Sequence, residues 1–278
     1  MPNFSILLPP AEGKQEGGNP YAPDMFDYRS STTFNFFKDL NPERRQLIKA
    51  VRKAVNDLDA DELEGVFGVK GDHLEAAIKA NADILNAPLM SALDRYSPGV
   101  MYQAMDFPGL PTGAQRRLLE EGIIFSGMFG LLRPDDLIPN YKLRMDSKVP
   151  GLGSGKDAVK VSQYWKPHVS EQLNRVVTGR FVWNLLSGIH EDAWDDAHTY
   201  DAMVRVKFMR KKSGKLETVS HGVKPLRGRL INYIVRETVE DLEEFHEWRH
   251  PDGYVMDRKL SSYDEDTRTH EIVMVKKG

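Results

Sequence analysis

The sequence contains no cysteine among its 278 residues. Disulfide scaffolds, thiolate-bound zinc, cysteine-ligated iron–sulfur clusters and thiol catalysis are therefore excluded. The sequence also lacks any apolar run of 18 or more residues, so we expect no transmembrane helix and no membrane partner. No basic residue precedes the short apolar run near the N-terminus, which argues against a secretory signal. We therefore expect a cytoplasmic protein.

Neither sign of charge is in large excess, but the charged residues are unevenly distributed along the chain. The formal net charge of −3 gives no sign of a nucleic-acid-binding protein. Residues 203–230, however, contain nine lysine and arginine residues and a single acid, Glu217. One surface can therefore be strongly basic although the chain as a whole is nearly neutral.

The apolar segments predict strands and helices in alternation. Strands are expected at residues 4–8, 123–132, 181–186 and 272–276, with a hairpin formed by residues 204–208 and 216–220 around a turn at Ser213 and Gly214. Helices are expected from Pro42, with Asn41 as its cap, and at residues 73–81, 88–96, 114–121, 157–174, 226–237 and 239–247. No repeat or linker interrupts this order, which predicts a single domain over residues 1–278, of the α/β class with a mixed sheet.

Two polar segments resemble metal or phosphate motifs only in part. Residues 151–156 have P-loop-like glycines, but Asp157 stands where a serine or threonine would bind magnesium, so a turn is the favoured interpretation. His190 and Glu191 begin like a zinc-protease helix, but Trp194 occupies the second histidine position. An iron site of His190, Glu191, Asp195 and His198 stays open as a weaker alternative to a solvated acidic face. We assign no cofactor and no metal centre.

Two glycine-containing breaks are candidates for a DNA-binding hairpin. In residues 107–115, Gly109 and Gly113 would direct backbone N–H groups at a phosphate and Arg116 would add charge. Pro111 removes one donor from that hairpin. A rival hairpin of the same kind contains Arg95 and Gly99. A plain connection between helices is the alternative interpretation of both breaks.

Several segments together resemble one family. They are LPPAEGK (residues 8–14), RYSPGVMY (95–102), FSGMFGLLRPDDLIPNYKLR (125–144), SQYW (162–165), VWNLLS (182–187) and KPLRGRLI (224–231). The chain is similar to the YaaA family of peroxide-stress proteins, and the resemblance runs from Ile6 nearly to the C-terminus. It implies one α/β domain with a cleft and a helix-hairpin-helix element, protection against hydrogen peroxide by lowering free iron, and binding of double-stranded DNA. The absence of cysteine excludes peroxide reduction by a thiol of this chain.

The residues that match the family pattern include several cations. Lys14 lies two places later than the lysine of the family's usual S-P-A-K segment, and Arg144 stands where glutamate is common. The other matches are Arg133, Tyr141, Met145, Asn184, Ser187, Lys224, Arg227 and Gly228, with Lys142 where arginine is common.

We expect a polar cleft at the strand ends. Its rim would contain Lys14, Arg133, Tyr141, Arg144, Lys224 and Arg227, and its interior Ser126, Asn184 and Trp165. Buried cations need an anionic partner, and arginine suits phosphate or carboxylate. The predicted anion-binding or DNA-binding residues are Arg133, Arg144, Lys224, Arg227, Arg229, Arg95, Gly99, Gly109, Gly113 and Arg116. In the alternative interpretation the cations pair with Asp135, Asp136 and Glu191 and only hold the fold together.

The sequence supports two functions. The first is a stress protein that binds double-stranded DNA through the basic cleft and a hairpin. The alternative is an enzyme that acts on a small phosphorylated or carboxylated substrate in the same cleft. Lys14, Tyr141 and Ser187 would then be the candidate acid, base or nucleophile. The sequence leaves the reaction and the oligomeric state open.

Overall fold

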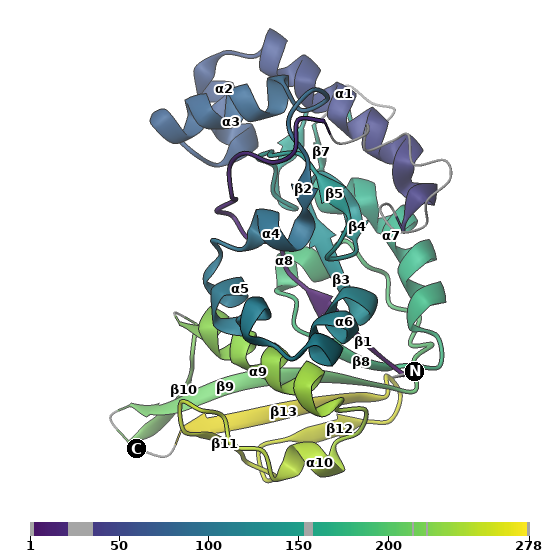
Figure 1. Ribbon diagram of the computed structural model, residues 1–278, viewed down its shortest axis with the longest axis vertical. Helices are drawn as coiled ribbons and strands as arrows, with labels where there is room; N and C mark the ends of the chain where they lie inside the picture. The colour runs from purple at the N-terminus through teal and green to yellow at the C-terminus, as the bar shows by residue number, and fades with distance from the viewer. Residues whose placement is uncertain (1–2, 22–35, 153–157, 213, 221, 277–278) are drawn as a thin grey trace.

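The computed structural model describes residues 3–21, 36–152, 158–212, 214–220 and 222–276 (Figure 1). Two parts of the sequence predictions lie outside these residues: residues 153–157 of the glycine-rich segment, and Ser213 of the expected turn.

A mixed sheet runs through the molecule in the order β11-β13-β9-β8-β1-β3-β4, with β10 paired to β9 and β12 paired to β13. Its strands are β1 (Phe4–Leu8), β3 (Gly122–Ser126), β4 (Gly130–Leu132), β8 (Phe181–Asn184), β9 (Ala202–Lys212), β10 (Lys215–Thr218), β11 (Tyr254–Met256), β12 (Ser262–Asp264) and β13 (Thr269–Lys276). Two further pairs are antiparallel: β2 (Met90–Ser91) with β5 (Leu137–Ile138), and β6 (Lys148–Val149) with β7 (Val159–Lys160).

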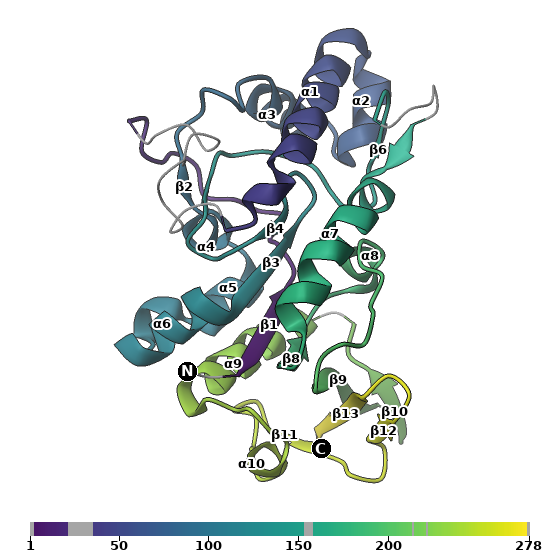
Figure 2. The same ribbon diagram turned by 90° about the vertical axis from the view of Figure 1, so that its right-hand side faces the viewer.

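The helices pack around this sheet. They are α1 (Asn41–Asp57), α2 (Ala60–Phe67), α3 (Asp72–Ala82), α4 (Ala92–Tyr96), α5 (Val100–Met105), α6 (Thr112–Glu121), α7 (Val161–Val177), α8 (Gly188–Glu191), α9 (Val223–Glu237) and α10 (Glu243–His246), with single 3-10 turns at Lys38–Leu40 and Phe107–Gly109. Helices α5 and α6 lie on one side of β1 and β3 and α7 on the other (Figure 2). The α/β class with a mixed sheet is therefore confirmed.

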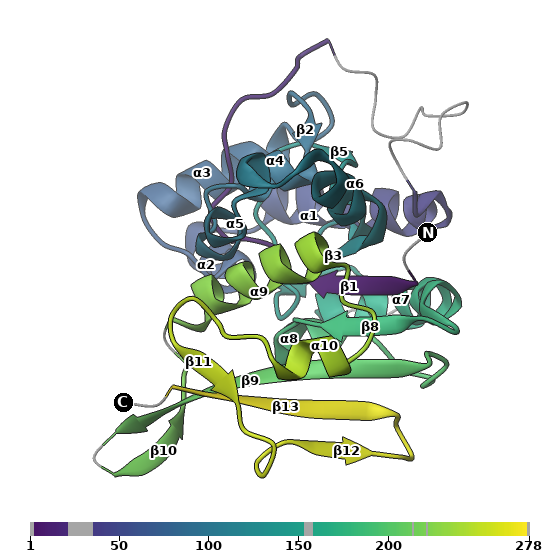
Figure 3. The same ribbon diagram turned by 60° about the horizontal axis from the view of Figure 1, so that its bottom comes forward.

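Strand β1 occupies the middle of the parallel part of the sheet, between β8 and β3 (Figure 3). All five of its residues are buried, as expected for a parallel strand covered on both faces. The chain passes from β1 to β3 on one side and later returns to β8 on the other side. Such a reversal leaves a crevice at the carboxyl ends of the strands, which is where α/β proteins bind ligands.

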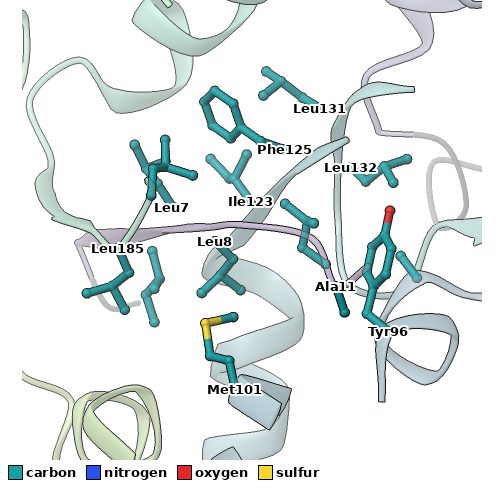
Figure 4. Close-up of a cluster of buried hydrophobic side chains, with 14 of the residues drawn as sticks. Leu7, Leu8, Ala11, Tyr96, Met101, Ile123, Phe125, Leu131, Leu132 and Leu185 are labelled. Atoms are coloured by element: carbon teal, nitrogen blue, oxygen red, sulfur yellow. The ribbon is translucent and has the colours of Figure 1, made fainter. Parts of the chain in front are cut away.

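The core beneath this crevice is apolar and continuous. Leu7 and Leu8 of β1 pack among side chains from β3, β4 and α5, including Phe125 and Met101 (Figure 4). These residues are fully or almost fully buried. The apolar runs that predicted buried strands are therefore the centre of the core.

Some elements differ from the prediction. The expected strand at residues 123–132 is an antiparallel hairpin of β3 and β4, because Gly130 adopts a positive φ of 70° and reverses the chain. The expected helix at 88–96 is shortened to α4 by the pairing of β2 with β5, and the one at 239–247 is reduced to α10. Helix α2 was not predicted, although Asp59 and Glu62 form a capping box at its start.

The helix-hairpin-helix element is not confirmed. Residues 107–109 form a 3-10 turn, in which the Gly109 N–H donates to the carbonyl of Asp106. The Asp106 carboxylate lies so close to Gly109 that a Cβ built on this glycine would be 2.2 Å from it. The Gly109 N–H is therefore bonded to a backbone carbonyl, and an acidic side chain lies beside this glycine. Residues 97–99 form a short turn between α4 and α5.

Helix α9 approaches α5 closely at Gly228. A Cβ built at this position would lie 2.2 Å from the carbonyl oxygen of Met101 and 2.8 Å from the Cβ of Ala104. Only glycine therefore permits this contact, which holds α9 against α5.

We predict that Gly228→Ala destabilises the protein by about 1–3 kcal/mol, because the added methyl group overpacks the α5–α9 contact. The matched control is Gly65→Ala in α2, where no atom lies within 4 Å of the built Cβ. That change should stabilise the helix by about 0.5–1 kcal/mol. Urea denaturation measures both values, and a Gly228→Ala variant as stable as the wild type would show that this contact tolerates a methyl group, contrary to the prediction.

Candidate anion-binding site

A hollow of about 330 Å³ lies where β1, β3 and β8 end. Residues 9–14 follow β1, Gly127 follows β3, and Ser187, Ile189 and His190 follow β8. Residues 98–102 and 141–145 form further walls, and α9 contributes Lys224 and Arg227. We refer to this hollow as the cleft. Its position matches the polar cleft that the sequence predicts at the strand ends.

Lys14 lies on the floor of the cleft. Its Nζ is 3.3 Å from the carbonyl oxygen of Ala11, 3.4 Å from that of Glu12, and 4.4 Å from the centre of the Tyr141 ring. Burial, with a smaller contribution from the nearby Lys142 charge, lowers the pKa of Lys14 to about 7. A substantial fraction of this amine is therefore neutral at physiological pH.

Tyr141 is fixed beside Lys14 by hydrogen bonds of its hydroxyl group. The Tyr141 hydroxyl oxygen lies 2.6 Å from that of Tyr96 and 2.8 Å from the Oγ of Ser126, and all three residues are buried. Burial raises the pKa of Tyr141 to about 12, so this phenol keeps its proton. Ser126 and Tyr141, both expected in the cleft, therefore form a buried network behind Lys14, and the ring of Tyr141 faces the amine.

Ser187 and His190 pair at the first turn of α8. The Oγ of Ser187 is 2.9 Å from the Nδ1 of His190. Burial, followed by the Arg227 charge, lowers the pKa of His190 to about 4, although Asp146 opposes this shift. The imidazole is therefore neutral at pH 7 and can accept a proton from the serine.

The cations of the cleft are of two kinds. Arg144 is neutralised locally, because its Nε and Nη2 donate to the two oxygens of Asp146 at 2.9 and 2.6 Å. Within the described part of the chain, no carboxylate lies within ion-pair distance of Lys14, Lys142, Lys224 or Arg227. The Nε of Arg227 is buried and has no hydrogen-bond partner among these residues. Glu12 is the acid among the described residues that line the cleft, so the positive charges of the cleft outnumber its negative ones.

Two predicted rim or hairpin arginines serve the fold instead. Arg133 does not line the cleft, because its guanidinium donates to the carbonyl of Leu119 at 2.9 and 2.7 Å. Arg95 is fully buried and donates to the carbonyls of Gln15, Pro88 and Ile138. Their donors satisfy backbone acceptors that burial would otherwise leave without partners.

Other predicted residues lie behind or outside the cleft. Trp165 is buried and donates its indole N–H to the carbonyl of Gly127 at 2.9 Å, and Asn184 donates to Glu191 at 2.8 Å. Gly99 lines the cleft, whereas Gly109 and Gly113 do not. Arg116 pairs with Glu120 and Arg229 with Asp252 on the surface.

The proposed iron ligands have other partners. Glu191 pairs with Arg205 at 3.2 Å, and His198 lies 3.3 Å from Asp196. Among the described residues no group of three or more histidine, aspartate or glutamate side chains is placed to hold a metal ion. The quartet that includes His190 and Asp195 is therefore not brought together.

His190 and Lys142 line the cleft although neither was predicted as a cleft residue. His190 follows Ser187 by three residues, a spacing that places both side chains on one face of a helical turn. That spacing is the signal that would have identified the pair from sequence.

Fold and cleft together define an α/β protein with a cation-lined crevice at the carboxyl edge of its parallel strands. A family model described as peroxide stress protein YaaA matches residues 4–260. The chain belongs to this family.

Relatives cover most of the chain at low identity. An uncharacterized protein of Campylobacter jejuni is 26% identical over 87% of this chain and 88% of its own length. A UPF0246 protein of Flavobacterium johnsoniae is 28% identical over 82% and 93%, and one of Corynebacterium glutamicum is 30% identical over 82% and 84%. No helix within the described residues has the length and apolarity needed to cross a bilayer.

We predict that His190 destabilises the fold in acid. Its pKa is about 4 in the folded protein, against an ordinary value of 6.5, so the unfolded chain binds more protons between these pH values. Stability from the neutral imidazole is therefore lost as the pH falls from about 6.5 to about 4. In His190→Asn this part of the loss disappears, by up to about 1.4 kcal/mol per pH unit. Urea denaturation from pH 4 to 7 measures the free energy of unfolding of both proteins. The same pH dependence in His190→Asn and the wild type would contradict the lowered pKa of His190.

Proposed function

We propose that the cleft binds a small phosphorylated or carboxylated molecule and that the protein is an enzyme that acts on it during the response to peroxide. The observation that carries this proposal is the convergence of Lys14, Lys142, Lys224 and Arg227 on one hollow without a carboxylate partner among the described residues. An anionic ligand would supply the missing charge and a partner for the Arg227 Nε.

The size of the cleft favours a small molecule. Small-molecule sites have volumes of roughly 300–1,000 Å³, and the cleft has about 330 Å³. A phosphorylated metabolite fits this volume, whereas a double helix does not. The apolar wall formed by Met101, Tyr102 and Met145 would contact the uncharged part of such a ligand.

The cleft also contains groups suited to catalysis. Lys14 offers an amine that is partly neutral at pH 7, and Ser187 offers a hydroxyl hydrogen-bonded to a neutral imidazole. Activation of a nucleophile by a lowered pKa or by an adjacent base is the usual requirement for covalent catalysis. Lowering of free iron and protection against peroxide, which the family resemblance implies, are proposed as the cellular outcome of this activity in the cytoplasm.

Binding of double-stranded DNA is the second candidate. It is favoured by the exposed basic residues of the β9–β10 hairpin, outside the cleft: Lys207, Arg210, Lys211 and Lys215. Lysines on such a surface would contact phosphates without reading bases.

Replacing Arg227 tests the first candidate. In Arg227→Gln we expect the affinity for inorganic pyrophosphate, measured by isothermal titration calorimetry, to fall roughly ten- to hundredfold, because one charge-assisted contact is lost. The matched control is Arg175→Gln, an exposed arginine of α7 that pairs with Glu171. Equal affinity in Arg227→Gln and the wild type, or no pyrophosphate binding by the wild type, would reject the proposal.

If the protein binds double-stranded DNA, its affinity should depend on salt and on the lysines of the β9–β10 hairpin. Binding of a labelled duplex should weaken steeply with salt, and changing Lys211 and Lys215 together to glutamine should reduce the slope of log K against log salt by about two. Pyrophosphate affinity should not change in this variant. Absence of duplex binding by the wild type at low salt would remove this candidate.

A further inference from the structure

The amine of Lys14 lies between two hollows. A second hollow of about 220 Å³ lies against α3, where His73, Ala76 and Ala80 form its wall. Glu12, Lys14, Tyr141 and Lys142 line both hollows. A molecule bound in the cleft can therefore reach the Lys14 side chain, and the second hollow gives space for a group that extends past it.

The amine is held in place without an ion-pair partner among the described residues. Its hydrogen-bond acceptors are the carbonyls of Ala11 and Glu12, from its own loop, and its Nζ lies over the ring of Tyr141. Ala11 is itself packed against Gly99, where a built Cβ would lie only 2.5 Å from the Ala11 Cβ. The loop that carries Lys14 is therefore fixed by the α4–α5 turn.

The charges around Lys14 favour its neutral form. Lys142 and Arg95 act on it as like charges, and Glu12 is the carboxylate that opposes them. Burial is the largest cause, and together with these like charges it lowers the pKa of Lys14 to about 7, so at pH 7 the neutral fraction is roughly a thousandfold larger than for an ordinary lysine. A lysine whose only task was to hold an anion would gain nothing from losing its charge. A neutral lysine amine beside other cations is instead suited to nucleophilic attack on a carbonyl carbon.

We propose that Lys14 forms a Schiff base with an anionic aldehyde or ketone, whose phosphate or carboxylate is held by the cations of the cleft. The Nζ lone pair forms the C–N bond while the carbonyl π electrons move to oxygen. Both amine protons leave with that oxygen as water, so the overall change is a condensation without oxidation or reduction. The imine nitrogen then takes up a proton from solvent and becomes an electron-withdrawing iminium. This inference rests on the proposed function, because the anion site brings the carbonyl to the amine.

Pyridoxal 5′-phosphate is a suitable probe, because it joins an aldehyde to a phosphate. The full-length protein is incubated with it near pH 7.5, reduced with borohydride, digested and analysed by peptide mass spectrometry. We expect the main reduced adduct on Lys14, with at least tenfold less on Lys259, an exposed lysine outside the cleft. The rate of adduct formation should fall about tenfold per pH unit well below pH 7, as the amine becomes protonated.

Three variants and one analogue separate this inference from the proposed function. Pyridoxine 5′-phosphate carries the phosphate but no aldehyde, so its binding reports the anion site alone. Lys14→Arg should keep binding of this analogue within a few fold and lose the reduced adduct. Arg227→Gln should weaken both analogue binding and adduct formation, whereas Lys259→Arg should change neither.

The outcomes are distinct. An adduct on Lys14 whose formation is suppressed when inorganic phosphate is present before the reduction supports the inference. Binding of pyridoxine 5′-phosphate that depends on Arg227, with no adduct on Lys14 or with adducts spread evenly over surface lysines, overturns the Schiff base and leaves the anion site standing. Failure of both probes to bind overturns the proposed function as well.

Discussion

The position of β1 between β8 and β3 is the constraint on which the rest of the structure depends. Parallel pairing on both sides buries the whole strand. Because β3 lies on one side of β1 and β8 on the other, a crevice forms at the carboxyl end of β1. Pro9 and Pro10 follow at once and cannot donate to a further ladder, so the chain turns away from the sheet. The loop that carries Lys14, the turn after β3 and the start of α8 therefore meet at one edge.

The cations near the cleft differ in whether they have a bonding partner among the described residues. Arg95 and Arg133 donate to backbone carbonyls, and Arg144 is matched by Asp146. Burial of an unmatched charge costs several kcal/mol, about what the removal of one partner from a buried ion pair costs. Lys14 avoids part of this cost by losing its proton, and Arg227, which cannot, keeps a buried Nε without a partner among the described residues. These two residues are the basis of the proposed anion site.

Much of the fold could be predicted from sequence, because apolar runs such as the one in β1 report burial directly. The hairpin of β3 and β4 could not, since a positive φ at Gly130 decides it and the apolar run continues across the turn. The cleft was predicted at the right edge, but Arg133 was placed in it wrongly, because sequence shows a cation and not the carbonyl that binds it. The sequence motif suggests His190 only as a metal ligand, although its three-residue spacing from Ser187 is the sequence signal for the hydrogen bond that α8 forms.

Locating a bound anion would show whether the unmatched cations of the cleft form an anion site. A crystal of the protein soaked in molybdate, a heavy oxyanion of phosphate-like shape, would show its position by anomalous scattering. We expect a peak in the cleft within hydrogen-bond distance of Arg227 and close to Lys224. Peaks confined to the β9–β10 hairpin, with none in the cleft, would contradict this assignment.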